Sequence, residues 1–198
     1  MRYRSDHKAR TRDRILQVAA AAIRAHGIDR FSLSEVMAGA DLTNGAFYAH
    51  FGSKDDLIAE AITFMFDERY AAFLEKVDTP DAKQALSDFI DYYLSVRHCD
   101  TPAFGCPLPA LASDVPHMAK DARIRFSAGV SRLIEGLADL LDHAGIAEPR
   151  LQANSVLAEL AGALSLARTA AHPAGAKTVL AASRSALKRR LGLVADAT

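Results

Sequence analysis

Apolar residues recur at intervals of three and four along most of the chain, which is the spacing of one buried face of an α-helix. Ile15, Ala19 and Ile23 follow this spacing, and Gly27 then stands where the C-terminal cap of a helix is expected. No segment alternates between apolar and polar residues as a half-buried strand does. The pattern therefore predicts an all-α fold, whose first helix covers residues 8–26.

Two short helices are predicted next. Ser32 and Glu35 have the spacing of a capping box, in which each side chain bonds a free amide at the start of a helix. After a turn, Thr43 can cap a third helix in which Phe47 and Phe51 lie four residues apart on one face. Two short helices joined by a tight turn form a helix-turn-helix, whose second helix can lie in the major groove of DNA.

Longer helices follow, and proline and glycine separate them. Ser53 can cap a helix that starts at Lys54, and Pro80 is expected to open the next helix, because proline suits the first turn. Residues 99–109 contain three prolines and one glycine, so no regular helix can pass through them intact. Later helices are expected to end near residue 143 and to cover residues 149–171 and 174–191, which makes about nine helices in all.

The charges are unevenly distributed along a chain that is neutral overall, with 24 basic and 24 acidic residues. Residues 1–54 hold nine Lys and Arg against five Asp and Glu, a net charge of +4, so residues 55–198 carry −4. This asymmetry indicates a polyanionic partner for the N-terminal end, although a charged run is more often simply a solvated surface. We divide the chain into a helix-turn-helix domain, residues 1–54, and a second helical domain, residues 55–198.

Several classes of protein are not expected. The charged N-terminus is not followed by an apolar run, so we expect no signal peptide and no membrane span, and a cytoplasmic location. Cys99 and Cys106 are too few for a disulfide framework and lack the spacing of a zinc site. Histidines are scattered and no catalytic motif occurs, so we expect no enzyme, no catalytic residue, no metal and no cofactor.

The segment LTNGAFYAHFGSK, residues 42–54, has the residue types of a DNA-binding surface. Asn44 can form a bidentate hydrogen bond with an adenine edge, and Gly45 allows DNA to approach the backbone closely. Tyr48 and His50 are expected to contact phosphates or sugars, and Lys54 begins a helix, where an anion is favoured. Alternatively, Tyr48 and His50 are half-buried packing residues and Lys54 is an idle surface charge.

A specific sequence run supports the DNA-binding interpretation. It consists of Phe47, Tyr48, His50, Phe51, Ser53 and Lys54, and it is preceded by Arg12, Ile15, Leu16, Ala19, Gly27, Ser32, Val36, Ala40 and Thr43 to Ala46 and followed by Asp55 to Leu57. Residues 12–57 thereby resemble the DNA-binding domain of the TetR family of transcriptional regulators. Departures from the family pattern are Met37, Asp41 and Ala46, the last of which lacks a hydroxyl group. The predicted DNA-contacting residues are Ser32, Thr43, Asn44, Gly45, Ala46, Tyr48, His50 and Lys54.

The resemblance implies a regulator, more often a repressor, that binds double-stranded DNA as a homodimer through its last two helices. It also implies a pocket in the middle of the chain for a small-molecule effector, whose binding releases the DNA. The candidate lining residues are Phe66, Tyr70, Phe89, Tyr92, Tyr93, His98, Phe104, Cys106, Met118 and Arg123. They suit an apolar or aromatic effector, but aromatic residues at helical spacing are also ordinary core.

Two other functions remain open from the sequence. Cys106 lies between glycine and proline, where a helix N-terminus could activate its thiol for sensing oxidants or electrophiles. A small apolar filler is the simpler interpretation of the same residue. A helical scaffold that binds only proteins would explain the C-terminal helices, but not the polar face formed by Tyr48, His50 and Lys54.

Overall fold

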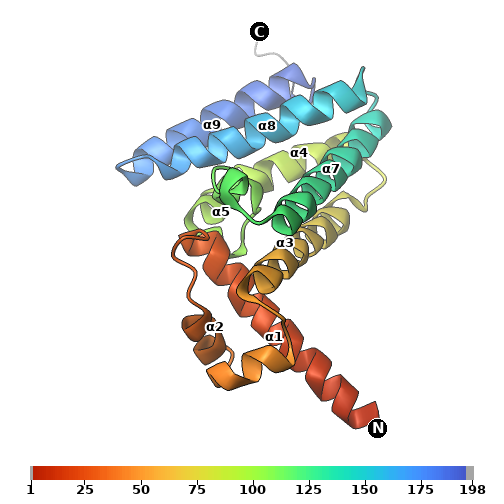
Figure 1. Ribbon diagram of the computed structural model, residues 1–198. Helices are drawn as coiled ribbons and strands as arrows, with labels where there is room; N and C mark the ends of the chain where they lie inside the picture. Colours follow the sequence, from red (N-terminus) through yellow and green to blue (C-terminus); the bar gives the residue numbers. More distant parts are fainter. Residues whose placement is uncertain (1, 195–198) are drawn as a thin grey trace. The chain divides into compact units, whose positions relative to one another are not determined.

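The computed structural model describes residues 2–194, with side chains from residue 7 onward (Figure 1). This part of the chain contains helices and loops and no strand, so the prediction of an all-α fold is confirmed. The α-helices are α1 (Arg2–His26), α2 (Leu33–Gly39), α3 (Lys54–Val77), α4 (Ala82–Tyr93), α5 (Val96–Asp100), α6 (Leu108–Leu111), α7 (Lys120–His143), α8 (Pro149–Arg168) and α9 (Pro173–Arg190). Three short 3-10 helices are η1 (Asn44–Ala49), η2 (Pro102–Phe104) and η3 (Val115–His117).

The chain packs as two compact units. The first contains the described residues up to Glu68 together with Pro102–Gly129, and the second contains Arg69–Thr101 and the described residues from Val130 onward. Two of the three divisions fall inside the long helices α3 and α7, and the third lies between α5 and η2. No helix of the described chain is long and apolar enough to cross a bilayer.

Most helix boundaries follow the sequence, but α1 begins at Arg2 and not at residue 8, and the start of α4 also differs. The expected opening of this helix at Pro80 is wrong, because α4 begins at Ala82. Asp81 is its N-cap, and the Asp81 carboxylate accepts a hydrogen bond from the backbone amide of Gln84 at 3.0 Å. A carboxylate at the helix start accepts a hydrogen bond from a free backbone amide, whereas a proline there only has no amide hydrogen of its own.

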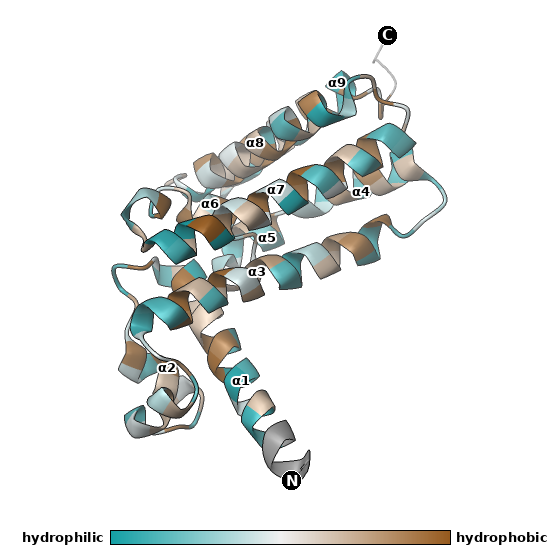
Figure 2. Cartoon of the chain, turned by 45° about the vertical axis from the view of Figure 1, so that its right-hand side comes forward, coloured by the Kyte–Doolittle hydropathy of each residue, from teal (hydrophilic) through white to brown (hydrophobic). Residues whose placement is uncertain are grey.

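In the first unit, α1, α2 and η1 each bury one face in a common core. Ile15 and Ile23 of α1, Val36 of α2 and Phe47 of η1 are almost completely buried, as the apolar spacing predicted. Apolar and polar residues are mixed along α1 and α7, as expected of helices with one buried face (Figure 2). The buried Arg24 side chain donates to the carboxylate of Glu68 at 2.9 Å and to the Gly105 carbonyl at 3.3 Å. The loop between η2 and α6, which contains Gly105, is thus tied to α1.

The second unit is built from an aromatic cluster and a long helical pair. Phe73 and Phe89 meet edge to face with ring centroids 5.0 Å apart, and Tyr93 and His98 do so at 4.8 Å. The α8 and α9 helices run alongside each other (Figure 1).

Burial lowers the pKa of His98 to about 4, with smaller contributions from the nearby positive charges of Arg168 and Arg69. His98 is therefore a neutral member of the core near neutral pH.

We predict that Gly129→Ala destabilises the protein by about 1–3 kcal/mol, because overpacking a core forces neighbouring side chains out of their preferred rotamers. An added Cβ at Gly129 would overlap the buried ring of Phe66, whose other contact is the edge-to-face ring of Phe126. The measurement is urea unfolding followed by circular dichroism. Phe66→Leu should cost less in the Gly129→Ala background than in the wild type. Additive effects of the two substitutions would contradict the proposed overlap.

Candidate nucleic-acid interface

The η1 helix is short, and aromatic packing fixes its position. Phe47 and Phe51 are 1% and 3% exposed, and their rings stack with centroids 5.8 Å apart. The turn before η1 passes through Asp41, whose φ of 54° lies in the left-handed region that aspartate tolerates better than most residues. The amide of Leu42 bonds the Met37 carbonyl at 2.9 Å and closes the turn. One face of η1 is therefore packed in the core.

The opposite face of η1 is open to solvent. Tyr48 is 75% exposed, and Thr43, Asn44 and Gly45 are exposed as well. An added Cβ at Gly45 would meet nothing closer than the Thr43 hydroxyl at 4.0 Å, so no protein atom requires a glycine there. Three members of the predicted set, Ser32, Ala46 and His50, are half-buried. The DNA contacts themselves stay a prediction.

Two capping expectations have different outcomes. Ser53 caps α3, since its hydroxyl accepts from the Asp56 amide at 3.1 Å. Thr43 is the N-cap residue of η1, as predicted, but its side chain makes no capping hydrogen bond. Instead the Thr43 carbonyl accepts from the Ala46 amide at 3.0 Å, which begins a 3-10 turn. The Thr43 hydroxyl thus has no role in closing η1.

Lys54 is not an idle charge. Its ammonium group donates to the Phe31 carbonyl at 2.9 Å and lies 5.3 Å from the centroid of the Phe31 ring. Phe31 directly precedes the N-cap of α2, so this bond ties the start of α3 to the start of α2. An ammonium has three donors, and the bond to Phe31 leaves two that can reach a phosphate.

His50 ends η1 in a half-buried position, and its Nδ1 atom is buried without a hydrogen-bond partner in the described residues. Burial lowers the pKa of His50, and the charges of Lys8, Arg12 and His7 lower it further. These three residues belong to α1, so the end of η1 and the start of α1 form one basic surface. Sequence reasoning missed His7 and Lys8, because only the net charge of the N-terminal segment pointed to them.

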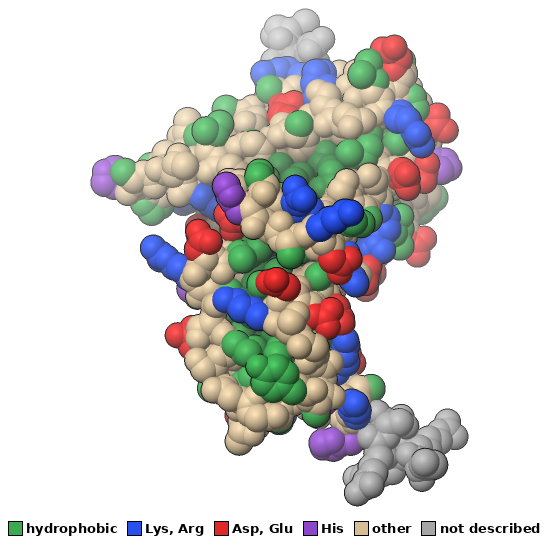
Figure 3. Space-filling model, in the orientation of Figure 1, with side chains coloured by type: hydrophobic (Ala, Val, Ile, Leu, Met, Phe, Trp, Pro, Cys, Tyr) green, Lys and Arg blue, Asp and Glu red, His purple; other side chains and the backbone are tan. Residues whose placement is uncertain are grey.

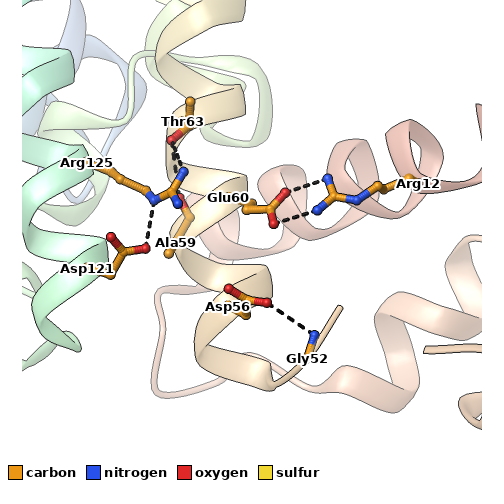
Figure 4. Close-up of polar contacts among 8 residues, drawn as sticks. All are labelled: Arg12, Gly52, Asp56, Ala59, Glu60, Thr63, Asp121 and Arg125. Atoms are coloured by element: carbon orange, nitrogen blue, oxygen red, sulfur yellow. Dashed lines mark hydrogen bonds and ion pairs between the residues drawn. The ribbon is translucent and has the colours of Figure 1, made fainter. Parts of the chain in front are cut away.

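A set of polar contacts fixes α1 and the end of η1 to α3 (Figure 4). The guanidinium of Arg12 forms a bidentate ion pair with Glu60 and lies 4.5 Å from the centroid of the Phe51 ring. One turn earlier in α3, the carboxylate of Asp56 accepts from the Gly52 amide at 3.2 Å. The fork of an arginine matches a carboxylate in both position and direction, so Arg12 determines where α1 crosses α3.

Comparison with known proteins agrees with this geometry. Residues 15–61 match the model of the bacterial regulatory proteins of the tetR family. The match covers the helix-turn-helix and the start of α3, so these residues form a DNA-binding domain of the kind found in that family. A search of curated proteins gives no match.

Solved structures show that the fold extends over nearly the whole chain. A TetR-family regulator from Agrobacterium tumefaciens has a TM-score of 0.78 at 23% identity, over 92% of this chain and 98% of that one. The reduced form of E. coli NemR has a TM-score of 0.75 at 20% identity, over 88% of this chain and 96% of that one. A TetR regulator from Legionella pneumophila has a TM-score of 0.77 at 24% identity, over 89% and 95%.

The residues predicted to line an effector pocket are mostly packed core. In the first unit, Phe66, Cys106 and Met118 are buried, whereas Phe104 and Arg123 are exposed. In the second unit, the aromatic cluster buries Phe89, Tyr93 and His98. Tyr92 accepts a hydrogen bond from Arg69 at 3.1 Å and lies under the ammonium group of Lys76. Tyr70 alone of the predicted set lines a groove, which is described below.

We predict that the affinity of the regulator for DNA rises as the pH falls, because a phosphate near His50 favours the imidazolium that the free protein disfavours. Uptake of one proton on binding limits the effect to about tenfold in Kd per pH unit. Fluorescence anisotropy with duplex DNA between about pH 8 and about pH 6, where histidine titrates, measures it. His50→Asn should flatten the dependence, and His117→Asn, at an exposed histidine of η3, should not. An unchanged slope in His50→Asn would exclude His50 as the titrating group.

Proposed function

We propose that the protein is a ligand-responsive repressor in the cytoplasm, which binds a palindromic operator as a homodimer and leaves it when a small molecule binds. The observation that carries the DNA-binding part is the exposed face of η1. Tyr48 projects into solvent from a helix whose other face is fixed by Phe47 and Phe51. A site on a fixed helix holds its contacting side chains more precisely than a site on a loop does.

The residues of this face divide into two roles in the proposal. Asn44 reads a base, because its amide can donate to and accept from an adenine edge at the same time. Thr43, Tyr48, His50 and Lys54 contact the phosphate backbone and set the register without reading sequence. Residues 1–54 then form the DNA-binding domain, and residues 55–198 provide dimerisation and the response to the effector.

Dimerisation is assigned to the exposed face of α8. Leu151 and Leu166 are 63% and 62% exposed, and between them the small residues Ala158 and Gly162 lie on the same face at helical spacing. Large apolar residues flanking small ones allow two helices to approach closely. Leu187 and Leu191, at the end of the chain's last helix, are buried in their own chain, which restricts the contribution of α9 to other residues.

The first test of the function is selection of bound sequences from randomised duplex DNA. A palindrome with half-sites about one helical turn apart is expected, since a two-fold dimer places two equivalent η1 helices in successive major grooves. Tyr48→Ala should weaken binding to all sequences, and Asn44→Ala should relax preference at one base position. Contacts to three phosphates give a slope of log K against log salt of about −2.7. Salt-independent binding and an absence of enrichment would favour the protein scaffold instead.

We predict that Ala158→Arg produces monomers and abolishes binding to the palindrome, because a buried unpaired charge cannot be accommodated between close-packed helices. The matched control is Ala71→Arg, an exposed alanine of α3 away from the proposed interface. Sedimentation velocity measures the oligomeric state, and circular dichroism verifies that both variants fold. A dimer of Ala158→Arg with wild-type stability would refute the assignment of α8.

Sensing through a cysteine is not favoured by the environment of the two thiols. Cys106 is 4% exposed and Cys99 is 7% exposed. Burial raises the pKa of the Cys99 thiol, so it stays protonated near neutral pH. The reactive form is the thiolate, and an oxidant or electrophile must also reach it. We therefore base the response to an effector on reversible binding and not on thiol chemistry.

A further inference from the structure

The second unit contains an open groove that borders its aromatic core and shares Phe73 with it. It is formed by the end of α3, the connection from α3 to α4, the first residues of α4 and the end of α7. Its volume is about 1190 Å³, which is of the size that accommodates a drug-sized ligand. Most of the residues predicted to line a pocket are packed core, and a ligand can enter this groove without displacing them.

The floor of the groove is aromatic. Phe73 is buried and Tyr70 is half-buried, and both rings lie against α7 at Gly136. An added Cβ at Gly136 would lie 3.0 Å from a ring carbon of Tyr70 and 3.1 Å from one of Phe73. The absence of a side chain at this position therefore lets both rings form a surface level with the helix backbone. Leu140, one turn later in α7, and Ala144, directly after the end of α7, extend this apolar surface.

The rim of the groove is acidic. Four carboxylates line it, those of Glu75, Asp78, Asp81 and Asp139, against the single ammonium of Lys83. Acidic side chains gather over the end of α7 and the start of α4 in the space-filling view (Figure 3). The remaining titratable group of the lining is His143, whose Nδ1 bonds the Asp139 backbone carbonyl at 2.7 Å and leaves the Asp139 carboxylate uninvolved.

Three of the four carboxylates are not used by the fold. Asp81 caps α4, but Glu75, Asp78 and Asp139 form no salt bridge with any basic side chain of the described chain. Carboxylates around a concave surface repel one another, and a cation between them relieves that repulsion. The aromatic floor adds an apolar contact, and the ring of Tyr70 already holds one positive charge, since the Arg132 guanidinium lies 4.7 Å from its centroid.

We propose that this groove binds a cationic small molecule with an apolar or aromatic body, and that this ligand is the effector of the regulator. The assignment rests on the proposed function and specifies its ligand class. It replaces the uncharged aromatic effector that the sequence favoured, because the aromatic residues behind that expectation are core and the accessible lining carries a net negative charge. The carboxylates select the charge, and Tyr70 and Phe73 accept the apolar part.

The test uses two ions of the same shape and opposite charge, tetraphenylphosphonium and tetraphenylborate, in calorimetric titrations of the full-length protein. Tetraphenylphosphonium should bind, and tetraphenylborate should not bind measurably. Asp78→Asn combined with Asp139→Asn should weaken binding of the cation by about tenfold, as expected from the loss of two partly solvated charges. Glu135→Gln, at an exposed residue of α7 outside the groove, is the matched control and should bind as the wild type does.

Equal binding of both ions, or unchanged binding of the cation in the double variant, would overturn the assignment of the groove. The role of the ligand is measured separately, by adding tetraphenylphosphonium to the complex with the selected operator. Binding of the cation without release of DNA would preserve the ligand class and refute release through this groove. Release of DNA by an uncharged compound that binds equally well to the double variant would preserve the proposed function and overturn the inference.

Discussion

The DNA-binding surface depends on the packing of Phe47 and Phe51 against the first unit. The η1 helix has six residues, and a helix of that length has no stability of its own in water. Its conformation is imposed by the two buried rings, which stack on each other, and by the guanidinium of Arg12, which lies over Phe51 and is oriented by Glu60. The exposed side chains of η1 can be presented in a fixed direction only because this packing is rigid.

The same contacts explain why the polar residues of the region are arranged as they are. Lys54 bonds the Phe31 carbonyl, and Asp56 bonds the Gly52 amide, so the backbone on both sides of α2 and η1 is held by α3. Each of these bonds satisfies a backbone group at a chain reversal, where neither helix can supply a partner. A residue such as Lys54 can therefore have a structural role and still offer donors to an anion.

Local patterns in the sequence predicted the helices well, because capping and periodicity act over a few residues. Ser53 caps α3, and Ile15 and Ile23 are buried, as their spacing indicated. The start of α4 was misplaced because Pro80 and Asp81 are both suitable near a helix start, and only the bond from Asp81 to Gln84 decides between them. The accessible faces of α8 and α9 could not be predicted. Leu187 and Leu166 have the same local pattern, yet Leu187 is buried and Leu166 is 62% exposed.

The proximity of His7 and Lys8 to His50, and of Glu75 to Asp139, depends on contacts between segments far apart in the sequence. No single-sequence pattern carries that information. Composition even conceals it, because the chain is neutral overall while it places basic residues at the start of α1 and carboxylates around the groove. The net charge adds the positive charge of one surface to the negative charge of the other, whereas a ligand responds to the electrostatic field at the surface that it binds.

The opposite signs of these two surfaces have a consequence for regulation. A polyanion is repelled by the rim formed by Glu75, Asp78 and Asp139, and a cation is repelled by the basic surface around His50 and Lys8. In the proposed regulator, DNA and a cationic effector therefore bind different residues, those of the first unit and those of the second. Any influence of one on the other has to be a coupling free energy between separate sites, and such a coupling is reciprocal. A cation that weakens DNA binding must itself bind more weakly to the protein on DNA, by the same factor.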